Sequence, residues 1–184
     1  SQVGESAERA WAFKRRADLA AGPLARPDEA IVLYRRSIEL APDDVEALGS
    51  LAKLLDAKQA WRELLPVLQA RRRLLPHGKE RGRTLKSLGD LWRSKLQNAA
   101  NAAEAYREAL QEHPDAAVVT HLAEVVEDAH TFRADLARAA EFAQNGQVDP
   151  DAFAPIDAAA GKAFLGRFKL PELAAEHFAK ALAR

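Results

Sequence analysis

The five histidines are the residues of this sequence whose chemistry could support metal binding or general acid–base catalysis. A helical metal site needs two of them three or four positions apart with a carboxylate nearby, and no two are spaced in this way. The sequence also has no phosphate-binding glycine loop and no nucleophile motif. We therefore expect no catalytic residue, no metal site and no cofactor. We expect the histidines to lie on the surface: His77, His113, His121, His130 and His177.

Two stretches of a single charge sign could bind a charged partner. Residues 71–86 carry seven basic residues against one acid, Glu80. A solvated turn between helices is the favoured interpretation of this stretch, and a site for an anion or an acidic partner is the alternative. No aromatic residue interleaves with the basic ones, which disfavours nucleic acid. Acids gather further along the chain, which predicts a dipolar surface: Glu124, Glu127, Asp128 and Asp135.

The composition is that of an ordinary globular protein, with 48% hydrophobic and 29% charged residues among 184. The 27 basic residues balance the 27 acidic ones, so no overall field attracts nucleic acid or an anionic membrane. The absence of cysteine excludes disulfides, thiolate catalysis and cysteine metal sites.

No basic segment followed by an apolar run is present, nor a run of 18 apolar residues, so we expect no export signal and no membrane insertion, which favours a cytoplasmic protein. Because the sequence contains no methionine, we expect it to be a piece of a longer protein.

An internal repeat must position the charged residues. Ala30, Ala102 and Ala174 stand 72 positions apart, and an aromatic residue follows each of them four positions later. Halfway between them the pattern returns with a leucine in place of the alanine, at Leu64 and Leu136, so the spacing alternates between 34 and 38. A period in this range indicates a stack of helical hairpins.

Apolar residues at helical spacing, separated by turn residues, predict ten helices and give no comparable strand signal. Asp44, Asp115 and Asp149 are placed to cap the helices that follow them, and Pro27 and Pro171 fit the first helical position. The predicted helices span residues 5–21, 27–40, 44–57, 60–74, 79–96, 99–112, 115–129, 132–144, 155–167 and 171–183.

The three tryptophans lie on apolar faces of the predicted helices. We therefore expect them to fill the core rather than to form a platform for a ligand. They are Trp11, Trp61 and Trp92.

This pattern resembles the tetratricopeptide repeat (TPR) family. That family pairs two helices in about 34 residues, with a small residue midway along the first helix, a small residue and an aromatic one on the second, and a closing proline. The small residues of the first helices are here Ala17, Ala52, Gly89, Ala123 and Gly161, and the closing prolines are Pro42, Pro76 and Pro114, with Val148 where a fourth is expected. The resemblance implies an all-α, right-handed α-solenoid of about five hairpins. It covers residues 1–184 as a single repeat domain with units at about 5–42, 44–76, 79–114, 115–148 and 150–184.

The odd units match the family pattern, whereas the even ones have Leu64 and Leu136 at the small position. Small residues let helices approach closely, so these leucines should push their helices apart and make the binding groove uneven. The even units resemble the variant repeats of large bacterial TPR scaffold proteins, and Pro66 inside one of them is expected to bend its helix.

In the family that the sequence resembles, a ligand lies in a concave groove lined by the first helix of each hairpin. The resemblance places these residues in that groove: Lys14, Lys53, Arg83, Lys86, Asp90, Arg93, Glu124, Glu127 and Asp128. The cations would take acidic groups and the acids basic ones, so the partner would be a protein or peptide segment of mixed charge. Members that hold the acidic tails of chaperones use asparagines where Asp18 and Ser50 stand here, which disfavours such tails.

The leading functional interpretation is a non-enzymatic scaffold or adaptor that binds a protein segment in this groove. One alternative is a structural module that self-associates through its ends, in particular through the C-terminal edge formed by Ala174, Phe178, Ala181 and Leu182. Another is a regulatory arm of an enzyme that lies outside the sequence.

Overall fold

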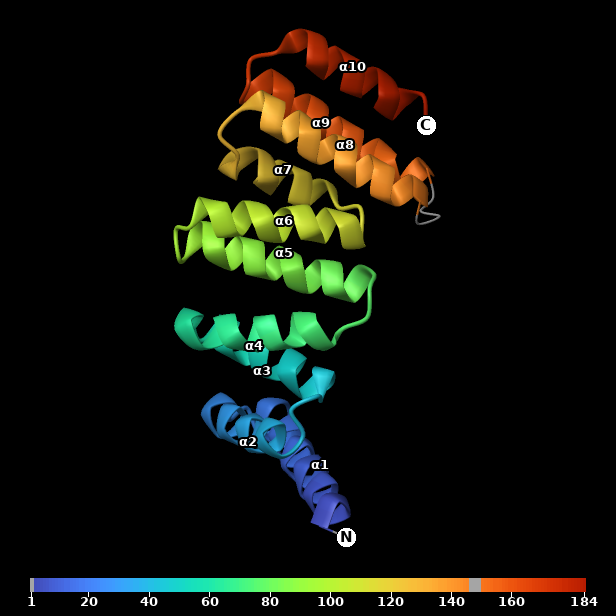
Figure 1. The fold of residues 1–184 in the computed structure, drawn as a ribbon. Helices are drawn as coiled ribbons and strands as arrows, with labels where there is room; N and C mark the ends of the chain where they lie inside the picture. The colour runs from blue at the N-terminus through green and yellow to red at the C-terminus, as the bar shows by residue number, and fades with distance from the viewer. Residues whose placement is uncertain (1, 146–149) are drawn as a thin grey trace. The chain divides into compact units, whose positions relative to one another are not determined.

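The computed structural model describes residues 2–145 and 150–184, and these residues form α-helices and no strand (Figure 1). Ten helices are present in the described residues, as predicted, and most ends lie within a few residues of the expected positions. They are α1 (Gln2–Ala21), α2 (Pro27–Leu40), α3 (Val45–Ala57), α4 (Trp61–Leu74), α5 (Lys79–Ser94), α6 (Ala99–Glu112), α7 (Ala116–Val125), α8 (Ala129–Asn145), α9 (Ala154–Gly166) and α10 (Pro171–Leu182), with a 3₁₀ turn, η1 (Pro150–Phe153), before α9. The predicted all-α fold is confirmed.

The chain divides into two compact units, Ser1–Leu75 and Pro76–Arg184. Unit 1 contains α1 to α4 and unit 2 contains α5 to α10 (Figure 1). The single domain over residues 1–184 and its five repeat boundaries stay a prediction. None of the described helices has the length and apolar character needed to cross a bilayer.

Side chains cap the N-termini of α3, α6 and α7. The Asp44 carboxylate accepts hydrogen bonds from the backbone N–H groups of Glu46 and Ala47, at 3.0 and 2.9 Å. Asp115 accepts one from the first turn of α7 at 2.8 Å, so both caps are confirmed. Asn98 caps α6 in the same way, although we did not predict it.

Pro27, Pro66 and Pro171 lie inside helices at the positions that the sequence indicates. Pro27 and Pro171 are the first residues of α2 and α10, where a missing N–H breaks no helical hydrogen bond. Pro66 lies within α4, which continues through it. The predicted cap Asp149 and the closing position Val148 lie outside the described residues.

The turn between the two helices of a hairpin is the same in four hairpins. Its central residue has φ between 51° and 59°, in the left-handed region, and these residues are Ala25, Gln59, Gln97 and Lys169. In three of the turns the next residue donates its N–H to the carbonyl six positions earlier, at 2.7–2.9 Å, which completes the end of the first helix. The fourth hairpin differs, because α7 ends at Val125 and Val126 is extended.

The odd hairpins close through a residue with no room for a larger side chain. A Cβ atom at Gly89 would lie 2.3 Å from Cε1 of Tyr106, and one at Gly161 would lie 2.7 Å from Cε1 of Phe178. Ala17, at the corresponding position of the first hairpin, is completely buried. The aromatic ring of the second helix therefore packs directly against the backbone of the first.

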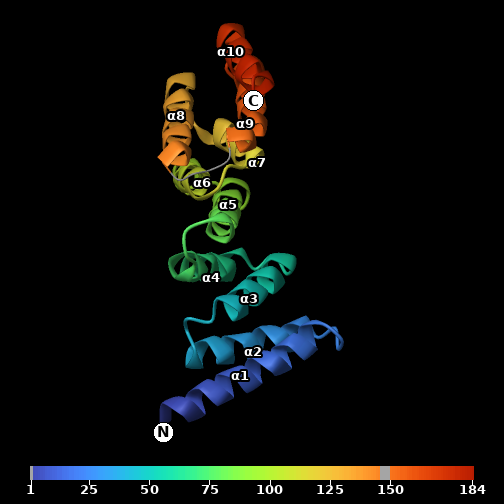
Figure 2. The same cartoon turned by 90° about the vertical axis from the view of Figure 1, so that its right-hand side faces the viewer.

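The even hairpins are more open, as the leucine substitutions predict. The two helices of the α3–α4 hairpin pack less extensively than those of the odd hairpins, and α7 touches α8 at few places while packing on α6 and α9. Within unit 2, α8 diverges from α9 and α10 (Figure 2). Phe132 near the start of α8 keeps contact with α9, with its ring centroid 5.3 Å from that of Phe164.

The expectation that all three tryptophans fill the core is wrong for Trp11, which is 65% exposed. The reason is that α1 packs extensively only on α2, so one side of α1 faces solvent. Trp61 and Trp92 are half-buried.

We predict that Gly89→Ala lowers the free energy of unfolding by about 1–3 kcal/mol, because the added Cβ would overlap the ring of Tyr106, and that Gly89→Leu lowers it further. Urea unfolding followed by circular dichroism measures the change. Gly166→Ala is the matched control, since it also adds a Cβ to a helical glycine but has no atom within 4 Å, and it should leave stability unchanged or raise it. Equal effects of the two alanines would contradict the close approach.

Candidate partner-binding site

A hydrogen bond between tyrosine and aspartate occurs twice, at positions 72 residues apart. The Tyr34 hydroxyl donates to Oδ1 of Asp18 at 2.7 Å, and the Tyr106 hydroxyl donates to Oδ1 of Asp90 at 2.7 Å. Each tyrosine belongs to the second helix of an odd hairpin, and each aspartate directly follows the small residue of the first helix. The packing that closes the hairpin therefore places the hydroxyl beside the carboxylate.

In unit 2, Asp90 is the centre of a larger network. Lys86 Nζ donates to its Oδ2 at 2.8 Å, and Nδ1 of His121 lies 2.8 Å from its Oδ1. Arg93 Nε donates to the hydroxyl oxygen of Tyr106 at 3.2 Å. The guanidinium of Arg93 also forms an ion pair with Glu124 of α7. Charged groups of α5 and α7 and a hydroxyl of α6 thus form one connected set.

The network sets the charge states of Asp90 and Tyr106 at neutral pH. Burial acts to raise the pKa of Asp90, but hydrogen bonds from Lys86 and Tyr106 outweigh it and hold that pKa below the ordinary value of 3.8. Burial and the adjacent Asp90 carboxylate raise the pKa of the Tyr106 hydroxyl. The aspartate is therefore ionised and the tyrosine remains a donor.

Unit 1 carries a smaller version of the same arrangement. Lys14, at the position of Lys86 in the 72-residue repeat, forms an ion pair with Glu46 of α3 at 2.8 Å. This hydrogen bond raises the pKa of Lys14 and lowers that of Glu46. Burial and the hydrogen bond to Asp18 raise the pKa of the Tyr34 hydroxyl, and a hydrogen bond with Ser50 of α3 opposes them.

The structure brings four of the nine predicted site residues into one cluster: Lys86, Asp90, Arg93 and Glu124. Tyr106 and His121 complete the cluster, and we did not predict either of them as a site residue. The signal for Tyr106 was present in the sequence, because a tyrosine and an aspartate both recur after 72 residues.

The other predicted residues lie outside this cluster. Lys14 belongs to the unit 1 arrangement, Lys53 is exposed on α3, and Arg83 is exposed and pairs within α5. The prediction that Glu127 and Asp128 share the helix face of Glu124 is wrong, because α7 ends before them. The Asp128 carboxylate instead accepts a backbone hydrogen bond from the start of α8.

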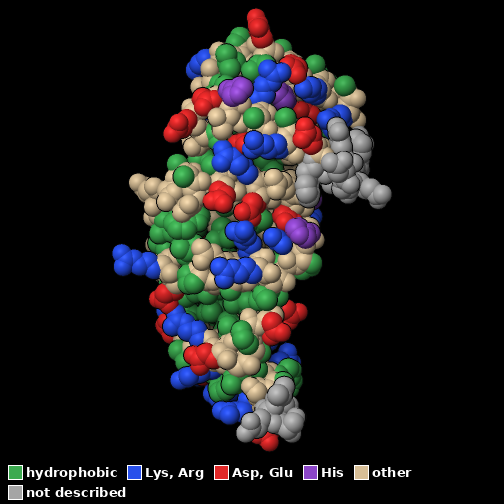
Figure 3. Space-filling view, viewed as in Figure 1, with side chains coloured by type: hydrophobic (Ala, Val, Ile, Leu, Met, Phe, Trp, Pro, Cys, Tyr) green, Lys and Arg blue, Asp and Glu red, His purple; other side chains and the backbone are tan. Residues whose placement is uncertain are grey.

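Ion pairs hold Arg81, Arg83 and Lys86 of the basic stretch at residues 71–86. Arg81 lies 3.1 Å from the buried carboxylate of Glu112, and Lys86 is paired with Asp90. Among the acids predicted for the surface, Asp135 is 5% exposed and pairs with Arg107 at 2.8 Å. On the face of each unit seen in Figure 3, acidic and basic side chains are interspersed rather than separated.

The expectation of surface histidines is wrong for His177, which is 9% exposed. Its Nδ1 lies 3.0 Å from Oδ1 of Asp157, and its ring stacks on Phe164 with the centroids 5.2 Å apart. This pair holds α10 against α9 inside the fifth hairpin. In the described part of the chain, no group of three or more histidine and acidic side chains could hold a metal ion.

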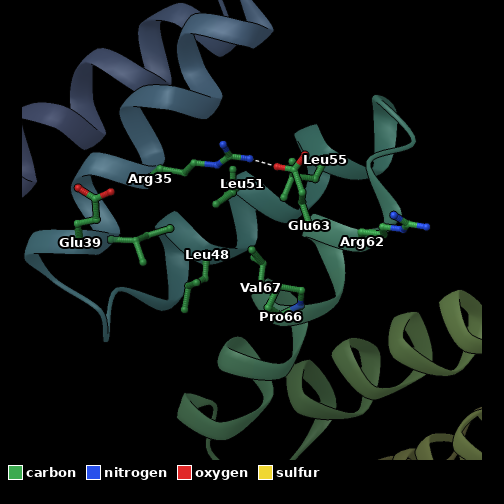
Figure 4. Close-up of a pocket in the computed structure, with 10 residues that line it drawn as sticks. Arg35, Glu39, Leu48, Leu51, Leu55, Arg62, Glu63, Pro66 and Val67 are labelled. Carbon is green, nitrogen blue, oxygen red and sulfur yellow. Dashed lines mark hydrogen bonds and ion pairs between the residues drawn. The ribbon is translucent and has the colours of Figure 1, made fainter.

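Unit 1 also has an apolar pocket of about 480 Å³ between α2, α3 and α4 (Figure 4). The ion pair between Arg35 and Glu63 lies at its rim. The corresponding pair in unit 2, 72 residues later, is Arg107 with Asp135. The lining residues are Arg35, Ile38, Glu39, Leu48, Leu51, Leu55, Arg62, Glu63, Pro66 and Val67. We did not predict this pocket.

Comparisons with known proteins place the chain by its fold. No protein-family model matches the sequence, and no curated protein is similar to it in sequence. Among solved structures, YrrB, described as a TPR protein with an unusual peptide-binding site, is 18% identical, with 99% of this chain and 89% of that chain covered and a TM-score of 0.58. The MamA protein is 20% identical, with 96% and 91% covered and a TM-score of 0.57. The chain therefore has the fold of a TPR protein, and the resemblance stated from the sequence is confirmed at the level of fold.

We predict that Asp90→Asn lowers the free energy of unfolding by about 1–3 kcal/mol at neutral pH, because Lys86 and Tyr106 lose a charged acceptor. Since the pKa of folded Asp90 lies below 3.8, its contribution is complete above that value and is lost as the pH falls through the lowered pKa. Urea unfolding of both proteins at neutral and acidic pH should show the difference narrowing in acid.

Asp56→Asn is the control, since Asp56 is an exposed aspartate of α3. It should change stability little at either pH. A constant difference between wild type and Asp90→Asn across this range would contradict the lowered pKa.

Proposed function

We propose that the chain is a non-enzymatic scaffold that binds a protein segment at the exposed sides of α5 and α7 in unit 2. The observation that carries this proposal is the part-buried network of Lys86, Asp90, Arg93, Tyr106 and Glu124, which presents oriented charges from α5 and α7 on one surface. The TPR fold supports the proposal, and YrrB is described as having a peptide-binding site. We assign no residue to catalysis, a metal or a cofactor.

A partner of mixed charge stays a prediction, and the cations of the network suit the acidic side chains of such a segment. Arg93 is 29% and Lys86 is 26% exposed, so each is reachable from one side and held on the other. We propose that the remaining predicted residues make contacts within their own units: Lys14 and Lys53 in unit 1, and Arg83, Glu127 and Asp128 in unit 2. A cytoplasmic location stays a prediction.

Reversing the charges of Lys86 and Arg93 would test this surface poorly, because it would place carboxylates beside Asp90 and Tyr106 and destabilise α5. Neutral substitutions remove the positive charges without introducing carboxylates beside Asp90 and Tyr106. We predict that Lys86→Gln and Arg93→Gln together reduce partner binding by tenfold or more, about 1.4 kcal/mol, since the surface loses both oriented cations.

The measurement is affinity capture with quantitative mass spectrometry, followed by titration of each captured protein. Arg36→Gln is the matched control, because Arg36 is an exposed, ion-paired arginine on a second helix, and this variant should retain every partner. Partners that bind the double variant and the control equally would contradict binding at this surface.

A second candidate function is self-association through the C-terminal edge. The apolar stripe of α10 is only partly covered: Ala174 is buried and Phe178 packs on Gly161, whereas Leu182 is 89% exposed. Burying a leucine side chain contributes about 1.5–3 kcal/mol, so this edge favours an apolar contact.

We predict that the protein self-associates as its concentration is raised and that Leu182→Glu abolishes this, as measured by sedimentation velocity. Leu24→Glu is the control, since Leu24 is 52% exposed but lies in the turn after α1 and should leave association unchanged. A monomer at every concentration, with and without Leu182→Glu, would exclude the edge as an association site.

A further inference from the structure

The two ion pairs that join neighbouring first helices share an asymmetry. Lys14 of α1 is 20% exposed, while its partner Glu46 of α3 is 83% exposed. Arg93 of α5 is 29% exposed, while its partner Glu124 of α7 is 47% exposed. In both pairs the cation is more buried than the carboxylate.

The asymmetry decides which partner can be replaced. A cation that has lost much of its water needs an anion beside it, whereas an exposed carboxylate released from the pair regains full hydration. An incoming carboxylate can therefore take the place of Glu46 or Glu124 without leaving a buried charge unpaired. An incoming ammonium group bound to Glu124 would take that carboxylate from part-buried Arg93 and leave it only the more distant carboxylate of Asp90, at 3.9 Å, which is unfavourable.

Within each unit, the aspartate that neighbours the cation is not open to an incoming cation. Asp90 accepts hydrogen bonds from Lys86 and Tyr106 and has His121 within 2.8 Å, and Asp18 accepts from Tyr34. The charge of Asp90 is balanced by Lys86, and Asp18 has the guanidinium of Arg15 at 3.9 Å. The groups open to exchange are thus the two cations.

From this geometry we propose that each unit takes a segment with acidic side chains, and that Glu46 in unit 1 and Glu124 in unit 2 are internal stand-ins which a carboxylate of such a segment displaces from Lys14 and from Arg93. The inference rests on the proposed function and names the chemistry of its partner. The binding groups are side-chain carboxylates within the segment, so no free C-terminus is required. The two glutamates then act as specificity residues, because they compete with every weakly acidic segment.

Glu46→Gln and Glu124→Gln provide the test, because each removes the competing charge at nearly constant shape. The probe is a fluorescein-labelled, C-terminally amidated peptide of glutamate, leucine and glycine, and its counterpart has lysine in place of every glutamate. Fluorescence polarisation with the whole chain gives the affinities, and circular dichroism verifies that each variant is folded. We expect each substitution to strengthen binding of the acidic peptide about three- to tenfold.

Glu39→Gln is the matched control. It also removes an exposed glutamate from an ion pair, but its partner Arg36 is 63% exposed and needs no replacement anion. This variant should bind the acidic peptide like the wild type. If Glu39→Gln strengthened binding of the acidic peptide by the same factor, the change in net charge alone would explain the effect, and the inference would be overturned.

The remaining outcomes separate the inference from the proposed function. Weaker or unchanged binding of the acidic peptide by Glu124→Gln, tighter binding of the lysine peptide, or no binding of the acidic peptide by any variant would overturn the displacement of glutamate. If captured partners still lose binding to the Lys86→Gln, Arg93→Gln variant, the proposed binding surface is supported even when the displacement of glutamate is overturned. If they keep binding there, the proposed surface itself fails.

Discussion

The packing of an aromatic ring against a residue without a side chain is the contact on which both the fold and the site depend. Tyr106 is fully buried against Gly89, and this closes the α5–α6 hairpin. The same placement brings its hydroxyl to Asp90, the next residue after the glycine. In the fifth hairpin Phe178 keeps the packing but has no hydroxyl, and Lys162 stands where the aspartate would be. The packing of the ring on the small residue therefore occurs in the fifth hairpin without the tyrosine–aspartate hydrogen bond. Among the described residues, that hydrogen bond is found only in hairpins that have the packing.

The position of Glu124 depends on a different device. The α7 helix lacks the left-handed turn that ends the first helices of the other hairpins, so its last carbonyls need other donors. The guanidinium of Arg167 donates to the carbonyl oxygens of Glu124 and Val126, at 3.0 and 2.5 Å. It also lies over the ring of Phe168, 5.4 Å from the centroid. Packing in the fifth hairpin thus fixes the helix end that carries the partner of Arg93.

Much of the fold could be predicted because the repeat shows in the sequence as a regular spacing of small and aromatic residues. Alanine or glycine on one helix and an aromatic residue on the next, 72 residues apart in successive copies, are visible without any structure, and so are the caps Asp44 and Asp115. The left-handed residues were not visible, because none of the four is a glycine or an asparagine. The early end of α7 at Val125 was also missed.

The site was predicted only in part, because helical spacing tells which face a residue lies on and not what lies opposite. Lys86 and Asp90 could be paired from the sequence, being four residues apart on one helix. The pairing of Arg93 with Glu124 joins different hairpins and depends on how α5 and α7 pack. The exposure of Trp11 depended likewise on which helices cover α1.

A surface whose charges are already paired binds differently from an open charged patch. Each new ion pair with a ligand replaces an internal one, so the electrostatic gain is the difference between two similar contacts. With 27 basic and 27 acidic residues, the chain also has no net field to speed association. On the proposed binding surface, charge would therefore contribute chiefly to selectivity and register, through cations held in place by Tyr106 and Asp90.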